Sequence, residues 1–461
     1  METERIEEAS QARPEAPTLE GMAESPPPAT PARGGASLWR NRDFNVFWTG
    51  QTLSAVGDAF AVIALPLLVL QATGSVAQMG LVTATFGGGQ FLAGLFAGPL
   101  VDRVDRRKLM LGCDVGRALL YAAIPLGWWL LGPRLWLVYV VVGLASMLSM
   151  CFSVAYVTAI PNLVDRERII DANGRLQSTL ALGWVIGPML AGVISARTGP
   201  ALAVGVDAVS FVISALSLLG IRLRQAAATP PPRGEEAKGK LHEMLAGIRF
   251  LLRERVLRWV MVLFACGSLL LAGGNDLFIY HIKHDLHQGD AAVGVLFGAA
   301  SVGGVLGAVM APRLRRWLGF GPSWLGGWAL SGLLIAAIGV VPQVSVAAVL
   351  AMVFVYFNNI AGINGMTIRQ QITPDHLLGR VTSAYFTVGM ALSPIGAAAV
   401  TAFAARFGAP LVLAAMGLSV TALALLGALT PSRERRPERR AVLYAPVAAE
   451  VSAPPHETPA A

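Results

Sequence analysis

The stretch Gly98-Pro-Leu-Val-Asp-Arg-Val-Asp-Arg-Arg-Lys-Leu109 decides the fold, because it sets a short, highly charged turn between two long apolar runs, 76–99 and 109–131. Charges this dense are costly in hydrocarbon, so the turn must lie in water at one face of a membrane. Its four cations place that face in the cytoplasm, since cytoplasmic loops carry an excess of lysine and arginine. A weaker copy of the turn, Ala311–Arg316, indicates that the chain consists of two related halves.

The composition is that of a polytopic membrane protein. Of the 461 residues, 54% are hydrophobic and 14% are charged, whereas soluble proteins carry about 25% charged residues. The net charge of +8 could indicate a nucleic-acid partner, but the positive residues are spread over alternate loops and follow the orientation rule, so we expect no nucleic-acid binding. The acidic, proline-rich residues 1–37 have no apolar core, and they predict a disordered cytoplasmic tail rather than a signal peptide.

A membrane-spanning helix needs about 20 mostly apolar residues, and the chain contains twelve such segments. They predict an all-α membrane protein with two pseudo-symmetric six-helix bundles, at 38–221 and 257–430. A cytoplasmic linker with an amphipathic helix, 222–256, joins the bundles, and a basic cytoplasmic tail, 431–461, follows them. The expected spans are 45–70, 76–100, 109–131, 135–158, 176–196, 201–221, 257–280, 291–312, 324–341, 344–365, 381–405 and 410–429.

The loops between these spans predict that both termini are cytoplasmic. With that orientation the basic residues gather in the inner loops, the linker and the C-terminal tail. The outer loops hold only Arg134, Arg197, Lys283 and Arg406. We therefore expect a multi-pass protein of the inner cell membrane, embedded in the lipid bilayer and acting as a monomer.

The charged turn resembles the signature loop of the major facilitator superfamily, written G-x-L-a-D-r-x-G-r-[RK]. The residues that fit the pattern are Gly98, Leu100, Asp102, Arg103, Arg106 and Arg107, whereas Val101 and Asp105 depart from it. The resemblance implies two six-helix halves with the substrate site between them. It also implies a gating role for Gly98, Asp102, Arg103 and Arg106, with Asp102 meeting the positive start of the helix near Gly379–Arg380.

The fifth span contains Gly183-Trp-Val-Ile-Gly187-Pro188-Met-Leu-Ala-Gly192, which resembles the superfamily's antiporter signature g-x-x-x-G-P-x-x-G-G, with Ala191 in place of one glycine. Pro188 removes a backbone hydrogen bond and the glycines admit a neighbouring helix, so this helix is a candidate for conformational change; ordinary small-residue packing is the alternative. Pro161–Val164 and Val206–Phe211 resemble bacterial drug and siderophore exporters of the macrolide-efflux and enterobactin-exporter type.

Acidic residues inside the predicted spans are functional candidates, because a charge at the centre of a membrane helix costs about 2.5–3.5 kcal/mol. Asp58 and Asp276 occupy matching positions of the internal repeat, and Asp207 lies in the sixth span. We predict that these three residues carry the proton coupling or contact the substrate, although hydrogen bonding to neighbouring helices is an equal alternative for Asp207. Asp114 and Arg117 are three residues apart, and we expect them to form a structural ion pair.

These features predict a proton-coupled exporter of small amphipathic molecules, such as drugs or siderophore-like metabolites, working by alternating access. The sequence has no catalytic triad, zinc cluster or nucleotide-binding loop, so we expect no enzymatic activity, cofactor or metal. A metal site at His281, His284 and His287 is conceivable, but a solvated loop is the preferred interpretation. The alternatives are an importer or uniporter on the same fold, and a non-transporting receptor or scaffold.

Overall fold

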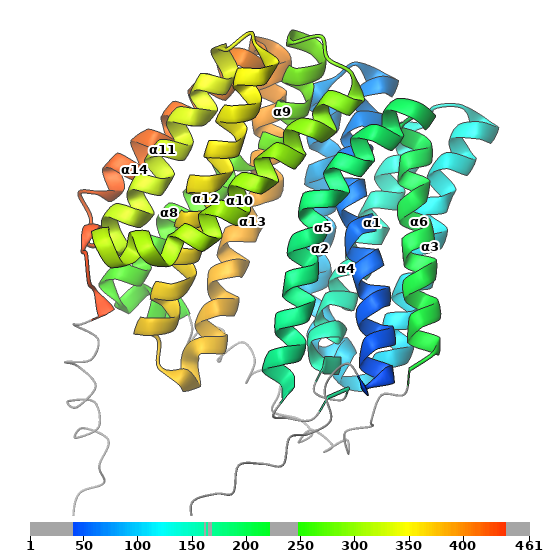
Figure 1. Ribbon diagram of the computed structural model, residues 1–461, viewed down its shortest axis with the longest axis horizontal. Helices are drawn as coiled ribbons and strands as arrows, with labels where there is room; N and C mark the ends of the chain where they lie inside the picture. The colour runs from blue at the N-terminus through cyan, green and yellow to red at the C-terminus, as the bar shows by residue number, and fades with distance from the viewer. Residues whose placement is uncertain (1–39, 161–162, 165–167, 222–247, 439–461) are drawn as a thin grey trace, which may run out of the picture. The chain divides into compact units, whose positions relative to one another are not determined.

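A computed structural model describes residues 40–160, 163–164, 168–221 and 248–438. The described residues from Asp43 onward belong to one compact unit, and the regular elements among them are all helices (Figure 1). Each of the twelve expected spans coincides with a helix or a pair of consecutive helices, which confirms the predicted fold class. Eleven described segments are long and apolar enough to cross a membrane.

The first half contains six helices. They are α1 (Arg42–Thr73), α2 (Val76–Arg103), α3 (Arg106–Leu131), α4 (Leu135–Ala159), α5 (Ile169–Thr198) and α6 (Pro200–Leu219). Of the amphipathic helix expected in the linker, residues 248–253 are helical and the remainder lies outside the described residues. The second half contains α8 (Arg255–Leu271), α9 (Gly274–Tyr280), α10 (Asp290–Leu318), α11 (Phe320–Val340), α12 (Val344–Ile372), α13 (Asp375–Phe407) and α14 (Ala409–Gly427).

The seventh span is divided rather than continuous. Gly273 adopts the left-handed conformation, with φ of +74°, and separates α8 from α9. A π-helical turn, His281–Asp285, then prolongs α9 toward the outer face. The prediction of a solvated histidine loop is therefore wrong for His281, which is buried in this turn with its Nδ1 2.8 Å from Asp285 Oδ2.

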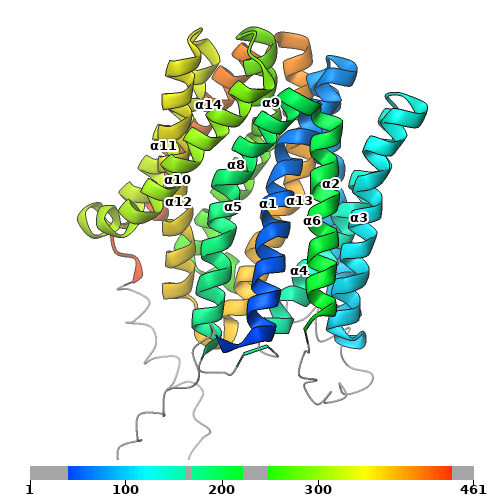
Figure 2. The same ribbon diagram turned by 45° about the vertical axis from the view of Figure 1, so that its right-hand side comes forward.

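The two halves meet along two helix pairs, α2 with α13 and α5 with α10. We call the end at which α3, α5 and α8 begin the inner end, and the end at which α2 and α10 begin the outer end (Figures 1 and 2). Contacts between the halves lie toward the outer end. A Cβ on Gly192 would lie 2.5 Å from the Cα of Gly294, so the backbones of α5 and α10 touch there.

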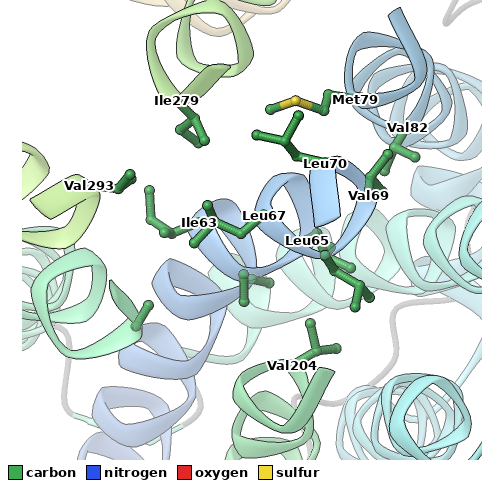
Figure 3. Packing of buried hydrophobic residues seen from close by; sticks show 14 of the residues in the cluster. Ile63, Leu65, Leu67, Val69, Leu70, Met79, Val82, Val204, Ile279 and Val293 are labelled. Atoms are coloured by element: carbon green, nitrogen blue, oxygen red, sulfur yellow. The ribbon is translucent and has the colours of Figure 1, made fainter. Parts of the chain in front are cut away.

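An apolar cluster shared by the two halves seals the outer end (Figure 3). Its members are fully or almost fully buried, so that little of their surface reaches water. We call the following set the outer plug: Ile63, Leu67 and Leu70 of α1, Met79 and Val82 of α2, Ile279 of α9 and Val293 of α10. Because the set draws on both halves, its apolar contacts hold their outer ends together.

The beginning of the C-terminal tail is part of the folded unit. A 3-10 turn, Pro431–Arg433, follows α14. The Phe320 and Gly321 amides at the start of α11 then donate hydrogen bonds to the Arg435 and Glu434 carbonyls, at 2.7 and 3.0 Å. The tail therefore fastens to the inner end of the second half.

Candidate transport site

A cavity of about 600 Å³ lies on the inner side of the outer plug, within the range of ligand-binding pockets. Five helices of the first half line it, and α9 of the second half closes it. It extends toward the inner end, because α4 contributes residues of 149–157 and α5 residues of 176–184. Aromatic rings cover much of its wall: Phe86, Tyr121, Phe152, Tyr156 and Trp184.

Asp58 of α1 faces this cavity, with 51% of its side chain exposed. A carboxyl group in the middle of an apolar span would be expected to be buried, and the packing of Gly57 explains why this one is exposed. A Cβ on Gly57 would lie 2.5 Å from the Asp207 carboxylate, so this face of α1 presses directly against α6. Asp58 follows about 100° further around the helix and so points into the cavity.

Arg117 of α3 is the centre of a charged cluster in the first half. Its guanidinium forms the expected ion pair with Asp114, and its Nη1 lies 4.0 Å from Asp58 Oδ1. The guanidinium carbon also lies over the rings of Phe152 and Phe211, 4.4 and 4.1 Å from their centres. Arg117 is consequently only 3% exposed although it borders the cavity.

Asp114 is held by a chain of hydrogen bonds that ties three helices together. Ser214 Oγ of α6 donates to Asp114 Oδ2 at 2.6 Å. Gln51 Nε2 of α1 donates in turn to Ser214 Oγ at 2.9 Å. With the Arg117 ion pair, these bonds satisfy a fully buried carboxylate, which is what a stable buried charge requires.

Asp207 of α6 lies behind α1 and does not line the cavity. The side chain is fully buried, and Ser210 Oγ donates to its Oδ1 at 3.0 Å. Its Oδ2 has no hydrogen-bond partner among the described residues. Asp207 thus has the expected hydrogen bond to a neighbour and also lies against Gly57, the residue before Asp58.

Asp276 of α9 reaches the same cavity from the second half. The side chain is 1% exposed and lines the cavity together with Asn275 and, from α2, Thr83. Its Oδ2 has no hydrogen-bond partner in the described part of the chain. The structure therefore brings Asp58 and Asp276, which occupy matching places in the repeat, to one cavity from opposite halves.

The glycines of α5 serve two different contacts. A Cβ on Gly187 would collide with Ala59 of α1, inside the first half, whereas Gly192 touches α10 across the halves. At Gly183 the nearest atoms are 3.5 Å away, an ordinary contact. Pro188 lies between the two close contacts, and its carbonyl is 3.0 Å from the position of a Cβ on Gly294.

The charged turn is described in part. The side chains of Gly98, Asp102 and Arg103 lie outside the described residues, although α2 extends through Arg103. Asp105 departs from the superfamily pattern, and its Oδ1 accepts a hydrogen bond from the Lys108 amide at 2.9 Å. It therefore caps the start of α3, which is a role that a glycine could not fill with a side chain.

A polar contact at the outer end escaped the sequence analysis. Asp290, the first residue of α10, accepts hydrogen bonds from Ser195 Oγ of α5 at 2.9 Å and from Gln71 Nε2 of α1 at 3.2 Å. It also forms an ion pair with Lys283 of the π-helical turn. We call Gln71, Ser195, Lys283 and Asp290 the outer lock. These residues lie far apart in the sequence, and no local motif marks them.

No group of metal-binding side chains suited to an ion occurs among the described residues. What the geometry provides is a membrane-embedded cavity lined mainly by the first helical half and reached by α9 of the second, with charged groups at its wall and a closed outer end. That arrangement defines a class of membrane protein that moves a small molecule across the bilayer.

Comparison with known proteins agrees with this class. A profile of the Major Facilitator Superfamily matches residues 47–397, so the chain belongs to that superfamily. The chain is 28% identical to the enterobactin exporter EntS of Shigella boydii serotype 18 over 360 residues, which cover 77% of this chain and 83% of the relative. It is 27% identical to the EntS of Citrobacter koseri over 359 residues, with the same coverage.

The fold also resembles solved transporters. A bacterial homologue of the iron transporter ferroportin, crystallised in an inward-facing state, superimposes with a TM-score of 0.67 at 19% identity, covering 85% of this chain and 99% of the homologue. The chain is therefore a multi-pass membrane transporter and not an enzyme. Membership of the superfamily also sets aside the alternative of a non-transporting receptor or scaffold.

Proposed function

We propose that the protein is a proton-coupled exporter of small amphipathic molecules, with both termini in the cytoplasm, acting as a monomer by alternating access. The distribution of loop cations supports this orientation. Under it, the cavity extends toward the cytoplasm, from which an exported substrate would enter. The similarity to enterobactin exporters supports the outward direction.

One observation carries the proton coupling: Asp58 and Asp114 share a single guanidinium, that of Arg117, and a third carboxyl group of the first half, Asp207, lies behind α1 against Gly57. One cation balances one carboxylate, and Asp114 takes that place with the additional hydrogen bonds it receives. Unbalanced charge is costly inside a membrane protein, and a bound proton removes it.

Asp58 is the member of this cluster that can exchange a proton with the cavity. Pairing with Arg117 would have argued for a structural role, but the 4.0 Å separation is at the limit of an ion pair and Asp114 holds the guanidinium more closely. Asp58 is also the exposed member, whereas Asp114 and Asp207 are buried. Asp58 is therefore the coupling residue, with Asp207 as a neighbouring carboxyl that its charge would affect.

The transport cycle follows from this arrangement. Substrate enters from the inner end and occupies the cavity, while Asp58 releases its proton to the cytoplasm. Separation of the outer plug and the outer lock then opens the cavity outward, where substrate leaves and a proton binds. For an uncharged substrate, one proton returning across 100 mV provides about 2.3 kcal/mol, enough to export against a gradient of tens-fold; exchange of one proton for a singly charged cation moves no net charge and is driven by the pH gradient alone.

The test is pH-gradient-driven transport in sealed inside-out vesicles. The Asp58→Asn variant keeps the shape of the side chain but cannot titrate, so we expect it to bind substrate and to lose gradient-driven accumulation. Asp43→Asn changes an acid at the start of α1, outside the cavity lining, and should transport normally. Intact proton-driven accumulation by Asp58→Asn would refute the assignment. Wild-type substrate movement out of loaded inside-out vesicles under the same gradient would instead favour the importer alternative.

A further inference from the structure

The charged side chains that line the cavity are two acids and one arginine that is already paired. Asp58 is half exposed, and Asp276, which is 1% exposed, lines the cavity with a buried carboxylate oxygen that has no hydrogen-bond partner among the described residues. Arg117 contributes little to a ligand, because Asp114 neutralises it and the rings of Phe152 and Phe211 lie against its guanidinium. An anionic ligand would therefore lie beside two acids, with no unpaired cation among the described lining residues.

The remaining wall suits the body of a basic amphipathic molecule. Aromatic faces attract organic cations, and Phe86, Tyr156 and Trp184 line the cavity together with apolar residues of α1 and α2. The volume of about 600 Å³ accommodates a molecule with several rings. The unpartnered Asp276 oxygen needs a donor or a cation to offset its burial.

We infer that the cavity binds an organic cation with an aromatic or otherwise apolar body, held between Asp276 of the second half and Asp58 of the first. The inference rests on the proposed transport function and divides the work of the two acids: Asp276 binds the substrate cation, and Asp58 exchanges it for a proton. A cation held by both residues contacts both halves, so its arrival and release affect the interface that must rearrange during transport.

Equilibrium binding of two ions of matched size and opposite charge tests this directly, without any gradient. Tetraphenylphosphonium and tetraphenylborate have nearly the same shape and opposite charge. With the full-length protein in lipid nanodiscs, and empty nanodiscs subtracted, we expect saturable binding of tetraphenylphosphonium only. Equal binding of both ions, preferential binding of tetraphenylborate, or no saturable binding of tetraphenylphosphonium would overturn the inference, and none of these outcomes depends on a variant folding correctly.

Substitutions of Asp276 then test whether this residue binds the cation. Loss of a buried charge partner typically weakens binding by about thirtyfold or more. We expect that loss for Asp276→Asn, a smaller one for Asp276→Glu, and none for the matched control Asp43→Asn. Unchanged tetraphenylphosphonium affinity in a monodisperse Asp276→Asn protein would refute the role of Asp276.

The binding experiment and the transport experiment can succeed or fail independently, so each tests its own proposal. Asp276-dependent cation binding without proton-driven transport would leave the binding site standing and refute the coupling. Proton-driven transport of an uncharged or anionic compound, without tetraphenylphosphonium binding, would leave the coupling standing and refute the cation site.

Discussion

Removing the hydrogen bonds that the first half donates to Asp290 should release the outer end. A hydrogen bond to a charged group contributes about 1.5–3 kcal/mol. We take about 1.5 kcal/mol for the Ser195 bond, which is buried, and about 1 kcal/mol for the Gln71 bond, which is longer and borders solvent. The Lys283 ion pair lies within the second half and survives both changes, so neither variant strands a buried charge.

Outward opening breaks both bonds. Removing a bond should therefore stabilise the outward-open protein, relative to the closed protein, by the free energy of that bond. At about 1.4 kcal/mol for each factor of ten, Ser195→Ala should raise that ratio about tenfold. Adding Gln71→Leu should bring the increase to roughly sixtyfold. The two effects should be close to additive if each residue acts through Asp290 alone.

The assay is the rate at which a membrane-impermeant maleimide labels a cysteine placed in the outer plug. Val293 is fully buried in the closed state, and Val293→Cys can be introduced after the three native cysteines are replaced. Right-side-out vesicles then report opening at the outer face. Ser419→Ala is the matched control, because its hydroxyl is exposed and bonds only the Ala415 carbonyl of its own helix, at 2.7 Å. Labelling of Val293→Cys at an unchanged rate in the Ser195→Ala, Gln71→Leu protein would refute the lock.

Two further changes test the remaining gating residues. Asp102→Asn should leave a membrane-inserted protein that transports more slowly, since it removes the negative group expected to face the positive start of α13; wild-type transport rates in vesicles would exclude the inner-gate role. Gly187→Leu adds four carbon atoms where even a Cβ collides with Ala59, so overpacking by about 1–3 kcal/mol should give normal insertion, seen on membrane blots, with little transport. Full activity of Gly187→Leu would mean that α1 and α5 can separate at no cost.

The sequence predicted what local pattern and internal repetition determine. The twelve spans follow from apolar runs, and the matching places of Asp58 and Asp276 in the two halves marked both acids as candidates, whereas only the structure shows that they line one cavity. The Asp114–Arg117 ion pair follows from a spacing of three on one helix. Each of these signals lies within one helix or one repeat, where the period of the chain fixes which side chains are neighbours.

Contacts between distant helices were not predictable in the same way. Asp290 and Ser195 are common polar residues near helix ends, and only the packing of α5 on α10 brings them together. The burial of His281 depends on a π-helical turn, whose extra residue per turn has no sequence signature. One usable signal was overlooked: Ser210 and Ser217 of α6 recur at the spacing of Gly57 and Gly50 of α1, and each serine fits against one of these glycines.

The short helix α9 joins the binding site to the outer closure. Asp276 faces the cavity, and Ile279, three residues further along the same helix, belongs to the outer plug. The left-handed Gly273 on one side and the π-helical turn on the other interrupt the regular hydrogen-bond pattern, so α9 is bounded by two points where the backbone can adjust. The π-helical turn also carries Lys283 of the outer lock.

A cation bound at Asp276 therefore acts on a segment that also carries part of the plug and of the lock. For this reason we expect tetraphenylphosphonium to change the labelling rate of Val293→Cys in the wild-type background, and to have no effect on that rate when Asp276 is replaced by asparagine.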